Sequence, residues 1–101
     1  MSLAIRKVVY KAQQLAGNKE YREAETCLRR YIEKHPEQPH YLVEFTLGNT
    51  LALMGKEREA LSYYRASAGL YLDYSAPWQN MGKVYFDLKE YEPAGDCLLK
   101  A

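Results

Sequence analysis

One feature constrains this chain more than any other: a small residue returns at two places in each of three units. The two series are Ala12, Gly48 and Gly82 and, twelve residues later, Ala24, Ala60 and Ala94. Both series advance by 36 and then by 34 residues. The segments around them carry apolar residues at helical spacing, and packed helices approach most closely where small side chains cross. The sequence therefore predicts a stack of three helical hairpins.

Length and charge narrow the classes of function. The chain has 101 residues and 48% hydrophobic content, which supplies a continuous core if each hairpin covers its neighbour. Its 14 basic and 13 acidic residues nearly cancel, so we expect no nucleic-acid partner. The longest apolar run, 51–54, is too short for a membrane span or a signal peptide. A soluble, cytoplasmic protein without membrane insertion is expected.

Six helices are expected from the apolar spacing and the residues that break helices. Their approximate ranges are 3–16, 20–34, 40–54, 57–71, 75–88 and from 90 onward. Gly17 and Asn18 are expected to end the first helix, because both tolerate left-handed backbone. The two prolines between residues 35 and 40 prevent the second and third helices from joining.

Candidate reactive side chains do not assemble into a site. Cys27 and Cys97 occupy equivalent positions two units apart, beyond disulfide reach, so both are interpreted as reduced packing residues. His35 and His40 flank the proline turn without a cysteine or carboxylate cluster to complete a metal site. We assign no catalytic residue, metal or cofactor, and an enzyme is the least favoured class.

The pattern resembles the tetratricopeptide repeat family. In the third unit the family's large apolar, small and aromatic positions are Trp78, Met81, Gly82, Tyr85, Ala94, Leu98 and Ala101. The first two units depart from the family at the tryptophan position, where Val8 and Glu44 stand. The resemblance implies a right-handed superhelical stack in one domain, with repeats near 5–38, 41–74 and 75–101. Trp78 is expected to be the largest buried side chain of its unit.

The resemblance also implies a concave groove, lined by the first helix of each hairpin, that binds a peptide or partner segment. The expected lining residues are Arg6, Val9, Gln13, Leu42, Phe45, Asn49, Gln79, Lys83 and Phe86. Gln13, Asn49 and Lys83 form a polar row beside apolar groups, which suits a peptide backbone and its side chains. The alternative is that Phe45 packs inward against the neighbouring hairpin.

Two further expectations concern the C-terminal end and the partner. The apolar side chains of the last helix that lack a following helix are Tyr91, Ala94, Cys97 and Leu98. Either the native chain continues, or two copies cover one another as a homo-oligomer. A non-catalytic scaffold or adaptor for a protein partner is the preferred function. The alternative is a small chaperone for a secreted or assembly-prone client protein.

Overall fold

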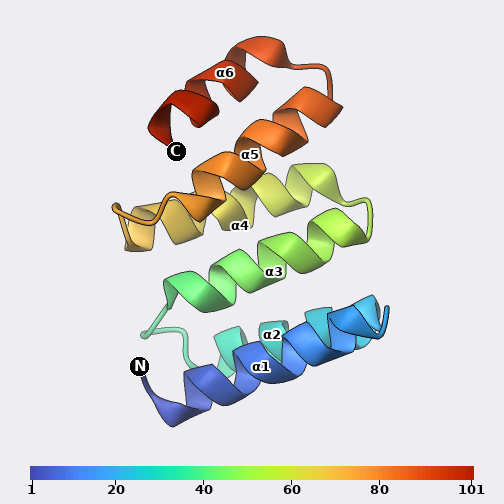
Figure 1. Cartoon of the computed structure of the whole chain (residues 1–101). Coiled ribbons are helices and arrows are strands. Elements are labelled where there is room, and N and C mark those ends of the chain that lie inside the picture. The colour runs from blue at the N-terminus through green and yellow to red at the C-terminus, as the bar shows by residue number, and fades with distance from the viewer.

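The computed structural model describes all 101 residues and contains six α-helices and no strand (Figure 1). The helices are α1 (Leu3–Gly17), α2 (Tyr21–Lys34), α3 (Tyr41–Leu53), α4 (Glu57–Leu70), α5 (Ala76–Asp87) and α6 (Tyr91–Lys100). The expected all-α class and all six helices are confirmed, with boundaries that differ by only one or two residues.

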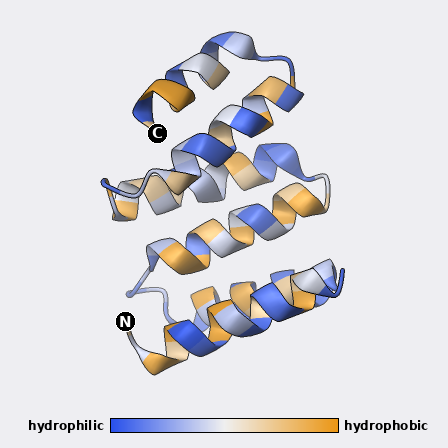
Figure 2. Cartoon of the chain, in the orientation of Figure 1, coloured by the Kyte–Doolittle hydropathy of each residue, from blue (hydrophilic) through white to orange (hydrophobic).

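The three hairpins stack in chain order. Helices α1, α3 and α5 lie toward the viewer in Figure 1, whereas α2 and α4 lie behind them. Each hairpin packs on the next through α2 against α3 and α4 against α5, and α1 also packs on α3. The two chain ends therefore lie at opposite ends of the stack. Figure 2 shows hydrophilic and hydrophobic residues alternating along most helices, as expected for helices with one face in a core.

The small residues lie at close helix crossings, as predicted. All four alanines of the two series are at most 2% exposed. A Cβ atom on Gly48 would lie 2.8 Å from ring atoms of Tyr64, and one on Gly82 would lie 2.9 Å from a methyl of Leu98. Both contacts are shorter than ordinary van der Waals distances, so these glycines allow the two helices of their hairpins to approach.

Helix α3 is the most buried element because α1 and α2 of the first hairpin pack on it together with α4 of its own hairpin. It buries Val43, Leu47 and Leu51 to 1% exposure or less. Its two buried threonines cost little, because the hydroxyls of Thr46 and Thr50 donate to backbone carbonyls one turn earlier, at 2.6 and 2.9 Å.

The turn within each hairpin has one residue with left-handed backbone, at the same position of the repeat. These residues are Lys19 (φ 63°), Gly55 (φ 79°) and Lys89 (φ 64°). In each turn the next residue's N–H donates to the carbonyl five residues earlier, as from Glu20 to Leu15 at 2.8 Å. Helix α1 ends at Gly17 with Asn18 as its C-cap, as expected, although the residue with left-handed backbone is Lys19 and neither of these two.

Two expectations about the third hairpin need correction. Trp78 is only partly buried, and the side chain that covers one face of its indole is Lys100 from the end of α6, with its Nζ 4.7 Å from the ring centroid. The core there is built by Met81, Val84 and Tyr85 instead. Ala94 and Cys97 are also buried, within the core that α6 shares with α5, so only Tyr91, Leu98 and Leu99 leave large apolar groups of α6 exposed.

Candidate functional site

A pocket of about 520 Å³ opens between α3 and α5. Its lining residues are Asn49, Ala52, Leu53, Glu57, Tyr64, Asn80, Lys83, Val84 and Asp87. Helices α3 and α5 supply most of the wall, and α4 contributes Glu57 from its first turn and the buried Tyr64. The pocket therefore joins residues of the second and third hairpins.

A hydrogen-bonded network fixes the polar part of this pocket. The Tyr64 hydroxyl donates to Asn49 Oδ1 at 2.7 Å, and Asn80 Nδ2 donates to the same oxygen at 2.8 Å. Burial raises the pKa of Tyr64 to about 12, so the phenol remains a donor at neutral pH. The acceptor oxygen of Asn49 is thus already used within the protein.

The same network leaves two polar atoms available to a ligand. Asn49 Nδ2 and Asn80 Oδ1 have no hydrogen-bond partner in the protein. No buried side-chain nitrogen or oxygen lacks a partner, so both atoms are accessible from the pocket. One amide donor and one amide acceptor are held side by side, and their two side chains are anchored by each other and by Tyr64.

Charged and apolar side chains border these amides. Lys83 and Asp87 are exposed on successive turns of α5, and Lys83 has no ion-pair partner. Leu53, at the end of α3, is 58% exposed. The pocket thus offers one cation, two carboxylates including Glu57, and an apolar group around the two amides.

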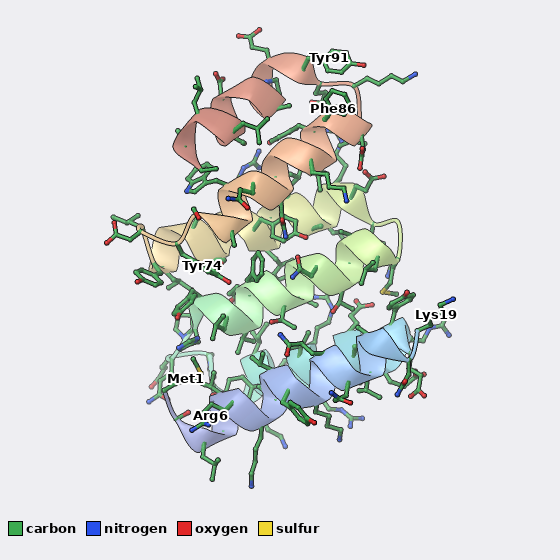
Figure 3. All side chains as sticks on the ribbon, viewed as in Figure 1. Met1, Arg6, Lys19, Tyr74, Phe86 and Tyr91 are labelled. Atoms are coloured by element: carbon green, nitrogen blue, oxygen red, sulfur yellow. The ribbon has the colours of Figure 1, made fainter.

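The predicted lining residues divide among separate places on the stack. Asn49 and Lys83 share the pocket, and Gln79 lies exposed one turn before Lys83. Phe86 is 61% exposed and its ring lies 5.4 Å from that of Tyr91, at the opposite end of the stack from Arg6 (Figure 3).

Phe45 belongs to an aromatic cluster at the beginning of α3, beside the half-buried Leu42. The Phe45 ring centroid lies 5.3 Å from Tyr74 and 5.8 Å from Tyr64. Tyr41 lies 5.0 Å from Tyr74 on the other side, and burial together with Tyr41 raises the pKa of Tyr74. This packing favours the alternative that Phe45 turns inward, and it ties α3 to the turn before α5.

The first hairpin contributes little to the pocket. Arg6, Val9 and Gln13 line a different hollow, of about 460 Å³, on α1. Val9 is only 8% exposed and belongs to the core, so it offers little surface to a bound segment. Gln13 does not share the pocket of Asn49 and Lys83, and the expected polar row is therefore interrupted between α1 and α3.

Sequence reasoning missed several pocket residues. Leu53, Glu57, Asn80 and Asp87 line the pocket but were not among the expected lining. A signal was available for two of them, because Asn80 and Asp87 lie three residues before and four residues after Lys83, on one helix face. Leu53 and Glu57 flank the turn of the second hairpin, where helical spacing does not predict which way a side chain points.

Other classes of site find no support in the chain. No group of three or more histidine, cysteine, aspartate or glutamate side chains is placed to hold a metal ion. Cys27 and Cys97 are both free thiols. None of the six helices has the length and apolar character that crossing a membrane would require.

Comparison with known proteins agrees with this architecture. Residues 76–101 match the sequence profile of the tetratricopeptide repeat family. None of the curated proteins matches the chain in sequence. Among solved structures, a chain of the CopN–Scc3 complex is similar with a TM-score of 0.86 and 23% identity, over 99% of this chain and 58% of the other.

Two further structures show the same likeness. A tetratricopeptide repeat protein from Parabacteroides merdae has a TM-score of 0.85 and 22% identity, over 98% of this chain and 39% of its own. MamA has a TM-score of 0.85 and 14% identity, over 95% and 55% of the two chains. The chain thus spans about two fifths to three fifths of the structures it matches, and shares their all-α helical repeat fold.

Proposed function

We propose that this chain is a non-catalytic interaction module and that the pocket between α3 and α5 binds an extended segment of a partner protein. The tetratricopeptide repeat at residues 76–101, and the fold that the chain shares with tetratricopeptide repeat proteins, support this proposal. The fold itself indicates a scaffold for protein partners; the pocket as the binding site is our proposal.

The pair of anchored asparagines carries this proposal. An extended peptide presents carbonyl oxygens and N–H groups along its backbone, and a free amide N–H of Asn49 beside the free oxygen of Asn80 can satisfy one of each. Because both side chains are already anchored, binding orders few additional rotamers. Leu53 and Lys83 then contact side chains of the bound segment, and favour an apolar residue and a carboxylate.

The polar groups of the pocket suit binding better than catalysis. General acid–base chemistry requires a pKa near the working pH, whereas the pKa of Tyr64, about 12, keeps its hydroxyl protonated. That hydroxyl also donates to Asn49 and is not directed at a ligand. An interaction module explains these residues without a chemical step.

A selection for short peptides tests the proposal. Octapeptides selected on the wild-type protein should bind the double variant Asn80→Ala, Lys83→Ala about tenfold more weakly, measured by fluorescence anisotropy. The matched control is Gln14→Ala, Lys89→Ala, which truncates an exposed amide and an exposed lysine that have no side-chain partner. Equal affinity for both double variants would contradict binding in this pocket.

A chaperone for a secreted or assembly-prone client is a second candidate. The observation that favours it is the likeness to a chain solved within a two-protein complex, CopN–Scc3. Such a role predicts that one aggregation-prone client co-purifies with the chain and becomes soluble through it, whereas a general adaptor binds several short peptides weakly.

Three further proposals concern the domain organisation, the cellular location and the self-association of the chain. We propose that residues 1–101 act as one domain, with repeats near 5–38, 41–74 and 75–101. We place it in the cytoplasm, where the two free cysteines would stay reduced. Association of two copies through the exposed Leu98 and Leu99 of α6 is a further proposal, which light scattering across concentration would test.

A further inference from the structure

A second hollow, separate from the proposed peptide pocket, lies between α1 and α2 at the N-terminal end of the stack. Its volume is about 840 Å³. Its floor is formed by four partly buried side chains, Val8, Leu15, Cys27 and Tyr31. We call this hollow the basic groove, because most of the charged residues on its exposed rim are basic.

Five basic side chains surround the apolar floor. They are Lys7, Lys11, Arg22, Arg30 and Lys34, and none of them takes part in an ion pair. Glu23 is the single acidic residue of the lining. The groove thus holds five of the chain's 14 basic residues and one of its 13 acidic residues. The positive charge is local, because the rest of the chain carries more acidic than basic residues.

The repeat shows what kind of element fits this surface. In the second and third hairpins the positions equivalent to Cys27 and Leu15 include Tyr63 and Tyr85. The second helix of the preceding hairpin contacts each: Arg29 of α2 is 5.5 Å from the Tyr63 ring, and Arg65 of α4 is 5.9 Å from the Tyr85 ring. The corresponding surface of the other hairpins is therefore covered by a helix.

The charge of the rim indicates the charge of a helix that could bind there. Lys7 and Lys11 stand where the other hairpins have Val43, Leu47 and their third-repeat equivalents, which are buried and apolar. Two lysines at these positions disfavour an apolar helix and match one with carboxylates along its edge. An apolar floor between charged rims suits an amphipathic helix better than a nucleic acid or a flat membrane surface.

We propose that the basic groove binds an acidic amphipathic helix of a partner protein. The apolar face of that helix would cover Leu15 and Tyr31, while its carboxylates pair with Lys7 and Lys11 on one side and with Arg30 on the other. This site is independent of the pocket between α3 and α5, so a partner can occupy both or either.

A designed peptide tests the inference directly. The probe is a fluorescein-labelled 18-residue helical peptide with leucines at every third or fourth position and glutamates on both flanks. Its control has the same leucines, with lysines in place of the glutamates. Wild-type protein should bind the glutamate peptide and not the lysine peptide, with affinity that falls as salt is raised.

Charge reversal on the protein provides the second arm. The variant Lys7→Glu, Lys11→Glu should bind the glutamate peptide at least about tenfold more weakly and should gain affinity for the lysine peptide. The control Lys19→Glu, Lys89→Glu makes the same charge change at exposed turn positions without ion pairs and should bind as the wild type does. Circular dichroism establishes that each variant is folded, and Arg30→Glu replaces the double variant if that one unfolds.

Several outcomes would overturn the inference. Equal binding of the glutamate peptide by wild type and Lys7→Glu, Lys11→Glu would remove the groove as its site. Binding of single-stranded RNA or of phosphatidylserine vesicles, without binding of the peptide, would assign the basic residues to another class of ligand. Self-association that the same variant abolishes would make α6 of a second copy, with Glu92 and Asp96, the occupant. The variant Lys7→Glu, Lys11→Glu should bind the selected octapeptides as the wild type does, so a failure of the basic groove can be distinguished from a failure of the pocket between α3 and α5.

Discussion

At the scale of single residues, Tyr64 links stability to pH. Burial raises its pKa from 10 to about 12, so the folded chain holds this proton more tightly than the unfolded chain does. The resulting stabilisation is complete below pH 10 and is lost as the pH rises toward 12. Two pKa units correspond to roughly 3 kcal/mol. Urea unfolding between pH 8 and 12 should show this loss in the wild type and not in Tyr64→Phe. Parallel pH profiles for the two proteins would contradict it.

At the scale of helices, the two glycine crossings should respond differently to the same substitution. Gly48→Ala places its methyl 2.8 Å from the rigid, buried ring of Tyr64, and we expect a loss of about 1–3 kcal/mol. Gly82→Ala meets a methyl of Leu98, a side chain that is 56% exposed and free to move. The gain in helix propensity, about 1 kcal/mol, then offsets most of that cost. Thermal unfolding should rank Gly48→Ala well below Gly82→Ala, and the reverse order would show that the crossings are not the limiting contacts.

At the scale of the whole molecule, an ion-pair cluster on α2 and α4 joins the first two hairpins. Arg29 donates to Glu25 and to Tyr63, both at 2.7 Å, and Lys56 lies 3.6 Å from Glu25. The hydrogen bond from Arg29 lowers the pKa of Glu25, so this contribution is present above pH 4.5 and is lost on acidification. Each hairpin in the stack contacts only its neighbours, so Arg29→Ala should destabilise the N-terminal hairpin first. Hydrogen exchange should accelerate in α1 and α2 more than in α6; uniform acceleration would contradict this.

The difference between the expected and observed sites also belongs to the whole molecule. Helical spacing identified Asn49 and Lys83 as neighbours across the groove, and the structure places both in one pocket. Spacing could not show that Tyr64 and Asn80 already occupy the oxygen of Asn49, because those bonds join helices from different parts of the chain. Nor could it show that Val9 lies in the core, since that depends on how α1 packs on both α2 and α3.

The sequence by itself determined the repeat, the six helices and their close crossings. Small residues and helix-breaking residues act over a few positions, so their order along the chain is enough to read them. Only the tertiary structure decided which polar atoms remain free, that Lys100 at the end of α6 covers Trp78, and that five unpaired cations surround one apolar hollow. These properties depend on the angles and distances between hairpins, which packing of the complete stack sets and no local pattern encodes.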